Sequence, residues 1–217
     1  MNLVKLVLDL IYPPRCPFCG RVLEVWEEEG LCHQCQKTLP WQLEVGKQVD
    51  FCARCFSPLW YRGSVRRGME QFKFRGGQIH ARLFGTLMAQ CLHDQWGEEV
   101  DCITWVPATR RRRGQRGFDQ CELLAREVGK NLGVEVVSAL EKVRDTKQQA
   151  RITSSSARQA NVTGAYTARE GIDLTGKQVV LVDDVVTSGA TMAECAACLR
   201  IAGAEKVIGL TLARAKK

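Results

Sequence analysis

The sequence predicts an α/β protein in which a parallel sheet carries helices on both faces and follows a small N-terminal cysteine module. Two observations lead to this prediction. Along residues 58–217, apolar runs of strand length alternate with segments whose apolar residues have helical spacing. Residues 1–57, in contrast, hold three Cys-x-x-Cys pairs and show little helical periodicity. We therefore expect an N-terminal helix and cysteine module over residues 1–57 and the main domain over residues 58–217.

Length and composition bound the class of protein. The chain has 217 residues, of which 45% are hydrophobic and 25% charged, which suffices for one core and a small appendage. A net charge of +7 favours anionic partners without choosing among phosphates, nucleotides, nucleic acid and acidic lipid. No run reaches the roughly 20 apolar residues of a membrane span. Because the five cysteines outside the pairs are scattered, we expect reduced thiols and a cytoplasmic protein.

The first half of the chain predicts helices before its first strand. Leu3–Tyr12 is apolar but interrupted by Lys5 and Asp9, which indicates a short amphipathic helix that ends at two prolines. Ser64–Phe74 and Gln78–Gln95 have helical apolar spacing. We expect a strand at Cys102–Val106.

The second half completes the alternation of strands and helices. Phe118–Leu132 has helical spacing, and the serine-rich stretch Gln148–Val162 indicates an exposed loop. The remaining expected elements are a buried strand at Val179–Val182, a helix at Gly189–Ala202 and a last strand at Lys206–Leu212. Such an alternation predicts right-handed crossovers and a ligand site beyond the carboxyl ends of the strands.

The paired cysteines predict a structural zinc site. Cys16-x-x-Cys19 and Cys32-x-x-Cys35 are separated by twelve residues, and four thiolates suit tetrahedral Zn²⁺. Cys52-x-x-Cys55 follows after sixteen residues and matches a four-cysteine pattern about as well, so the sequence leaves open which two pairs share the metal. We expect the first two pairs to be the ligands. The alternatives are a redox dithiol and plain buried cysteines.

The segment that follows the strand at residues 179–182 predicts a site for a phosphorylated sugar. Asp183 and Asp184 end the strand, and Thr187-Ser188-Gly189-Ala190-Thr191 leads into the next helix. Free N–H groups and small hydroxyl residues at a helix start can hold a phosphate. The two carboxylates can bind a ribose diol or hydrated Mg²⁺. The simpler alternative is that the two acids only cap a turn.

At this point the chain resembles the type I phosphoribosyltransferases. Their binding motif for 5-phosphoribosyl 1-diphosphate is similar, without a break, to residues 180–191. Further matches narrow the resemblance to the ComF family and cover nearly the whole chain. They are the cysteine ribbon, Lys73-Phe74-Arg75-Gly76, Pro107 with Arg112, Arg116-Gly117-Phe118-Asp119-Gln120, Thr146 with Gln149, and Arg158 with Asn161.

The resemblance implies a fold of the type I phosphoribosyltransferase kind and a set of site residues. It implies that Asp183 and Asp184 are the catalytic pair, that Arg112 and Arg116 contact the diphosphate, and that Mg²⁺ accompanies the ligand. The residues implied to bind 5-phosphoribosyl 1-diphosphate are Asp183, Asp184, Val185, Thr187, Ser188, Gly189, Ala190, Thr191, Arg112 and Arg116. We expect Arg110–Arg113 to lie on a loop at the ligand edge of the sheet.

The chain departs from the family pattern at two places. The family usually has Asn where this chain has Asp119, which puts an acid into a stretch expected to contact anion or substrate. Many members also have four cysteine pairs and two zinc ions, whereas this chain has three pairs.

The expected function is that of a ComF-family phosphoribosyltransferase-type protein linked to DNA uptake in natural transformation. No residue identifies the acceptor substrate or a general base. The alternative is a non-enzymatic protein that senses 5-phosphoribosyl 1-diphosphate or binds single-stranded DNA beside other competence proteins. The sequence does not indicate an oligomeric state.

Overall fold

The computed structural model describes residues 13–24, 27, 30–74, 77–144 and 160–216, except for the side chains of Arg110 and Arg112. The helix expected at Leu3–Tyr12 and most of the loop expected at Gln148–Val162 lie outside these residues. In the part of the chain that is described, no helix is both long and apolar enough to cross a membrane.

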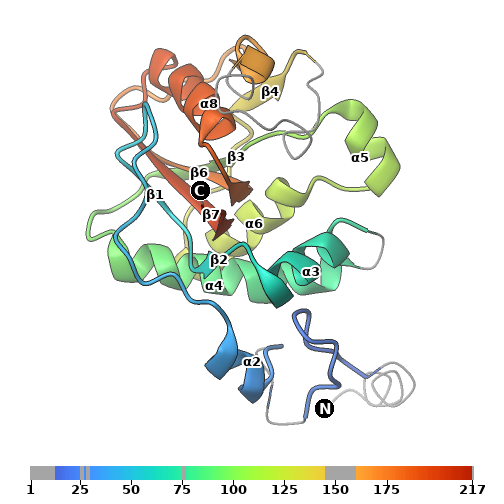
Figure 1. Cartoon of the computed structure of the whole chain (residues 1–217). Helices are drawn as coiled ribbons and strands as arrows, with labels where there is room; N and C mark the ends of the chain where they lie inside the picture. Colours follow the sequence, from blue (N-terminus) through green and yellow to red (C-terminus); the bar gives the residue numbers. More distant parts are fainter. Residues whose placement is uncertain (1–12, 25–26, 28–29, 75–76, 145–159, 217) are drawn as a thin grey trace.

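Short strands and helices alternate along the chain (Figure 1). The helices are α2 (His33–Thr38), α3 (Gly63–Phe72), η1 (Gly77–His80, a 3-10 helix), α4 (Ala81–Gln95), α5 (Arg110–Arg116), α6 (Gln120–Leu132) and α8 (Ala190–Ile201). The strands are β1 (Arg54–Phe56), β2 (Leu59–Trp60), β3 (Cys102–Trp105), β4 (Leu140–Lys142), β5 (Tyr166–Ala168), β6 (Gln178–Val186) and β7 (Lys206–Arg214).

The main sheet has five strands, all parallel, in the order β1-β7-β6-β3, with β2 also paired to β7. The two longest strands, β6 and β7, lie at its centre and pair from Gln178 with Lys206 to Val186 with Arg214. A second sheet joins β4 and β5 in antiparallel fashion. This architecture confirms the predicted α/β fold.

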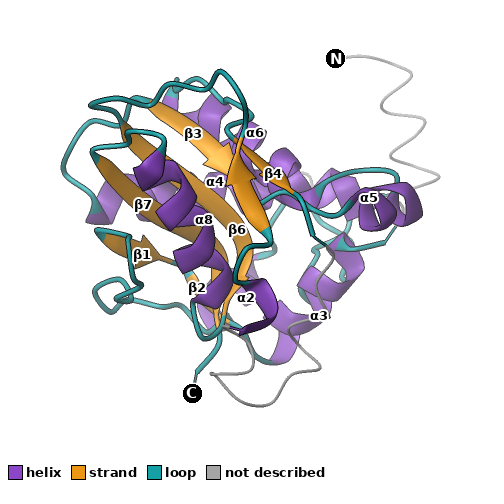
Figure 2. Ribbon diagram, turned by 90° about the horizontal axis from the view of Figure 1, so that it is seen from above, coloured by secondary structure: helices purple, strands orange, loops and turns teal. Residues whose placement is uncertain are grey.

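Helices cover both faces of the main sheet (Figure 2). Because side chains alternate along a strand, Val180 and Val182 of β6 pack into the core on the side of α4 and α6. Val179 and Leu181 pack into the opposite core, on the side of α8. Burial on both faces explains the continuous apolar run of β6.

The cysteine module packs against α3 and α4 on the same side as α6 (Figure 1). The rings of Phe18 and Phe84 lie 5.5 Å apart, and the rings of Phe72 and Phe84 lie 5.3 Å apart. A Cβ added to Gly68 would come within 2.8 Å of the carbonyl oxygen of Pro17, so α3 needs a glycine there. The module and this face of the sheet therefore share one hydrophobic core.

The division into residues 1–57 and 58–217 stays a prediction. The strand β1 precedes that boundary and pairs with β7, with Cys55 opposite Gly209. Lys47 in turn exchanges two backbone hydrogen bonds with Cys55, so the segment before β1 is also joined to the large sheet.

Two local expectations differ from the structure. The strand β6 does not end at Asp183 and Asp184 but continues to Val186, because β7 provides backbone partners as far as Arg214. The arginine run does not form a loop but the helix α5, in which the N–H of Arg113 donates to the carbonyl of Thr109. Arginine is a good helix former, and this run contains no residue that breaks a helix before Gly114.

Candidate functional site

Two adjacent carboxylates stand near the carboxyl end of the central strand β6. Asp183 Oδ1 accepts hydrogen bonds from the N–H of Asp184 at 2.8 Å and from the thiol of Cys121 on α6 at 3.4 Å. Asp184 Oδ2 lies 2.8 Å from Nζ of Lys73, the C-cap residue of α3. The pair is thus held from two sides, by a thiol on α6 and by a cation on α3.

The surroundings of the two carboxylates separate their pKa values. Burial, followed by the negative charge of Asp184, raises the pKa of Asp183 to about 7. Burial also opposes ionisation of Asp184, but the charge and hydrogen bond of Lys73 keep the pKa of Asp184 below its usual value. Around neutral pH, Asp184 is therefore the ionised member, and Asp183 readily gains or loses a proton.

The loop Thr187–Gly189 links β6 to α8, whose first turn contains Ala190 and Thr191. Gly189 is the N-cap of α8 and has φ of +97°, a conformation that favours glycine. The N–H of Ala190 lies 3.4 Å from the hydroxyl of Ser188. Because the first N–H groups of a helix have no partner within it, this loop presents amide donors next to the two carboxylates.

A residue that the sequence analysis did not single out lies against this loop. Lys47, between α2 and β1, donates from Nζ to the carbonyl oxygens of Thr187 at 2.5 Å and Ser188 at 2.9 Å. The two segments are about 140 residues apart in the chain, and no motif marks Lys47. Only the tertiary structure could reveal this contact.

Of the arginines expected at the site, Arg116 is the one whose charge acts on Asp184 in the described residues. Arg116, at the end of α5, donates to Oε1 of Gln120, and its positive charge helps to lower the pKa of Asp184. The backbone of Arg112 belongs to the same helix, but its side chain is outside the described part. Arg75, Thr146, Gln149 and Arg158 are also outside it.

Asp119 has a structural role in place of the ligand contact that its position suggested. Its side chain is 4% exposed and caps α6, because Oδ1 accepts from the N–H of Cys121 at 3.1 Å. Its Oδ2 accepts from the N–H of Ala108 at 2.8 Å. Asp119 therefore ties the segment after β3 to the start of α6, and burial raises its pKa despite these hydrogen bonds.

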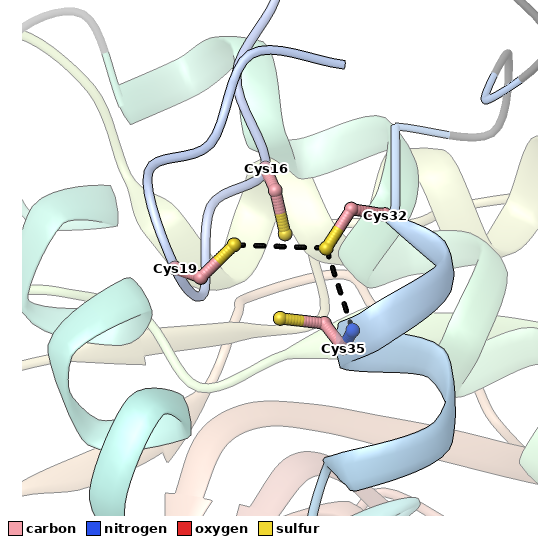
Figure 3. Close-up of side chains that lie close together, drawn as sticks. All are labelled: Cys16, Cys19, Cys32 and Cys35. Carbon is pink, nitrogen blue, oxygen red and sulfur yellow. Dashed lines mark hydrogen bonds between the residues drawn. The ribbon is translucent and has the colours of Figure 1, made fainter. Parts of the chain in front are cut away.

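Four cysteines come together in the N-terminal module (Figure 3). The sulfur atoms of Cys16, Cys19, Cys32 and Cys35 all lie within 4.8 Å of one another, and those of Cys19 and Cys32 are 3.6 Å apart. Bonds of about 2.3 Å in a tetrahedron place sulfurs roughly 3.8 Å apart, so the geometry fits Zn²⁺. The N–H of Cys35 also donates to the sulfur of Cys32 at 3.3 Å. Since four thiolates leave no open position, this is a structural zinc site.

The third cysteine pair lies at the edge of the main sheet, in β1 and in the turn before it. Cys55 is buried in β1, and a Cβ added to Gly209 on the neighbouring strand would come within 3.0 Å of its sulfur. Cys52 is partly buried and packs against the core on the α8 side of the sheet. Neither joins the four-cysteine cluster in the described residues.

Comparison with known proteins follows the two parts of the structure. Residues 7–67 match the family model of the double zinc ribbon domain, and residues 119–217 match that of the phosphoribosyl transferase domain. The DNA utilization protein YhgH of Escherichia coli is 34% identical over 198 residues, which cover 88% of this chain and 80% of that protein. The chain belongs to the ComF family.

Other relatives carry names that refer to competence. Competence protein F of Haemophilus influenzae is 26% identical, with coverage of 93% of this chain and 97% of that protein. Competence protein ComFC of Bacillus subtilis is 24% identical, with coverage of 92% and 77%. In this ComF-family chain, the Asp183–Asp184 pair and the loop to Thr191 lie within the matched phosphoribosyl transferase domain.

Proposed function

We propose that this protein binds 5-phosphoribosyl 1-diphosphate with Mg²⁺ at the carboxyl end of β6 and acts as a phosphoribosyltransferase. The observation that carries the proposal is the position of Asp183 and Asp184 immediately before the amide donors of Thr187–Thr191. A ribose and its 5-phosphate need these two kinds of group side by side.

Each part of the ligand has a candidate partner. The amides and hydroxyls from Thr187 to Thr191 hold the 5-phosphate, and Val185 continues the strand between them and the acids. Asp183 and Asp184 accept hydrogen bonds from the ribose hydroxyls. Arg112 and Arg116 bind the diphosphate, for which planar guanidinium groups are suited.

Mg²⁺ fits this site because carboxylate oxygens are its preferred protein ligands. When bound, it supplies positive charge that stabilises the departing diphosphate. Lys73 already neutralises Asp184 at 2.8 Å, so Asp183 is the carboxylate with more freedom to respond to the metal or the sugar. Positioning and electrostatic stabilisation account for catalysis in this proposal, without a dedicated general base.

The biological role proposed is a cytoplasmic one, linked to DNA uptake in natural transformation. The names of the relatives, DNA utilization protein and competence protein, support this role. A non-catalytic version of the proposal, in which the site senses 5-phosphoribosyl 1-diphosphate or the chain binds single-stranded DNA, is supported by the net charge of +7 and the exposed Arg111 and Arg113.

Calorimetry on the zinc-loaded protein tests the proposal. Wild type should bind 5-phosphoribosyl 1-diphosphate in the presence of Mg²⁺, and the double change Asp183→Asn/Asp184→Asn should abolish this binding. Replacing Arg112 and Arg116 by alanine should weaken it, and unchanged binding would remove the two arginines from the site. Single-stranded DNA is the parallel ligand. Steeply salt-dependent DNA binding without any binding of the diphosphate would favour the nucleic-acid role and overturn the transferase proposal.

A further inference from the structure

The segment that contributes Lys47 is anchored to the main sheet. The N–H of Lys47 donates to the carbonyl of Cys55 at 2.7 Å, and the N–H of Cys55 donates to the carbonyl of Lys47 at 2.9 Å. The N–H of Cys52 closes the turn between them by donating to the carbonyl of Val49 at 3.1 Å. Figure 1 shows this hairpin rising from the end of α2 along the sheet edge to the level of α8. The position of Lys47 is thus set by β1, a strand of the sheet that carries the site.

Two side chains of this hairpin contact the loop before α8. Lys47 Nζ donates to the carbonyl oxygens of two successive residues, Thr187 and Ser188. Val49 is buried and lies against Gly189, where an added Cβ would come within 3.2 Å of a Val49 methyl group. The hairpin therefore packs against one side of the loop Thr187–Gly189.

These contacts determine where the amides of the loop point. In a trans peptide, the carbonyl of one residue and the N–H of the next point in opposite directions. When Lys47 holds the carbonyls of Thr187 and Ser188, the N–H groups of Ser188 and Gly189 must point away from the hairpin. The ammonium also polarises both peptide groups and so strengthens these two donors.

We propose that Lys47 is a positioning residue of the phosphate loop, which orients the amides of Ser188 and Gly189 toward the 5-phosphate of the ligand without touching it. This inference rests on the proposed function, because Lys47 would orient amides of the same ligand site. The inference also gives the segment between α2 and β1 a role in ligand binding.

The inference can be tested with two ligands that each contain part of 5-phosphoribosyl 1-diphosphate. Ribose 5-phosphate carries the phosphate that the loop would hold, whereas inorganic pyrophosphate carries the part assigned to the arginines. In the full zinc-loaded chain, Lys47→Met should weaken ribose 5-phosphate binding at least about tenfold, since two charge-assisted hydrogen bonds are lost. A tenfold loss corresponds to roughly 1.4 kcal/mol of binding free energy. The affinity for pyrophosphate should change less than about twofold, because the arginines and not the loop are assigned to it.

Two further variants distinguish positioning from a loss of charge or of folding. Lys47→Arg keeps a cation that can donate to two carbonyls and should restore most of the ribose 5-phosphate affinity. Lys37→Met removes the same charge from the exposed end of α2 and should leave both affinities unchanged. Amide NMR signals of Ser188 and Gly189 in the ligand-free protein should shift in Lys47→Met and stay in place in Lys37→Met. If Lys47→Met does not fold, Lys47→Arg and Lys47→Gln are compared by the same two readouts.

The outcomes separate the two proposals. If wild type binds ribose 5-phosphate and Lys47→Met binds it equally well, the positioning role is wrong while the proposed function stands. An equal loss of ribose 5-phosphate and pyrophosphate affinity would indicate general structural damage and would also overturn the role. If wild type binds neither ribose 5-phosphate, nor pyrophosphate, nor 5-phosphoribosyl 1-diphosphate, the proposed function fails, and the inference fails with it.

Discussion

Lys73, at the end of α3, and Asp184, in the central strand β6, form an ion pair with 2.8 Å between Nζ and Oδ2. The pair joins the helical layer to the carboxyl end of the sheet and decides which of two adjacent acids is ionised. Lys73 is the first residue of Lys73-Phe74-Arg75-Gly76, a tetrapeptide in which the chain resembles its family. The ion pair with Asp184 is a physical reason for a lysine at this position.

Replacing Lys73 by methionine should raise the pKa of Asp184. Without the ammonium, burial opposes ionisation of that carboxylate, and only the backbone N–H of Val185 and the charge of Arg116 still counter it. The free energy of unfolding at pH 8 should fall by about 1 kcal/mol, because both side chains are partly exposed. Carboxyl carbon NMR titration and urea denaturation measure the two effects.

A matched control for this change lies on the same helix. Arg66 forms an exposed ion pair with Glu70, so Arg66→Met should alter neither the titration of Asp184 nor the stability appreciably. Lys73→Arg should preserve the low pKa of Asp184. Identical titration curves in wild type and Lys73→Met would contradict the assignment.

Replacing Asp183 by asparagine should stabilise the ligand-free protein at alkaline pH while abolishing ligand binding. The pKa of Asp183 is raised to about 7 in the folded state, so the unfolded chain releases this proton at lower pH than the folded chain. The contribution of Asp183 therefore lowers the free energy of unfolding as pH rises from about 4 to about 7. At pH 8, Asp183→Asn should be more stable than wild type by at most about 4 kcal/mol, since each unit of pKa difference corresponds to roughly 1.4 kcal/mol.

Denaturation with urea at pH 5 and pH 8 measures this effect. The difference in free energy of unfolding between Asp183→Asn and wild type should be smaller at pH 5 than at pH 8. Asp94→Asn, at an exposed position on α4, is the control and should follow wild type at both pH values. A stability difference that does not change with pH would show that Asp183 does not titrate in this interval.

Replacing Asp119 by alanine should destabilise the protein by about 1–2 kcal/mol, because it leaves the N–H groups of Ala108 and Cys121 without their acceptor. Asp119→Asn should cost less, since the amide keeps one acceptor oxygen and avoids burying a charge. Thermal unfolding measures both. A larger loss in Asp119→Asn than in Asp119→Ala would mean that the negative charge itself is required.

Zinc content should distinguish the cysteine pairs. Purified wild type should contain one zinc per chain in the four-cysteine site, and Cys16→Ser or Cys32→Ser should lose it and lower the melting temperature. The loss of stability follows because the module shares a core with α3 and α4. Cys52→Ser should keep the zinc, and metal analysis by mass spectrometry checks all three variants. Loss of zinc in Cys52→Ser would place that pair in a metal site.

Local patterns in the sequence were sufficient to predict much of this protein. The apolar run at residues 179–182, the acids after it and the glycine before α8 specify a buried strand, a polar edge and a helix start. Each of these depends on neighbouring residues in the chain. The Cys-x-x-Cys spacing predicted the metal chemistry for the same reason, and the resemblance to the ComF family added the type of transferase fold.

Contacts between distant segments could be decided only by the tertiary structure. The choice among three cysteine pairs depended on Cys55 entering β1, which placed it in the main sheet and outside the four-cysteine cluster. The length of β6 depended on β7, and the role of Asp119 depended on the backbone of Ala108. Lys47 meets Thr187 only because β1 pairs with β7 next to β6. Spacing along the chain reports local backbone geometry, whereas these contacts arise from the order of strands in the sheet.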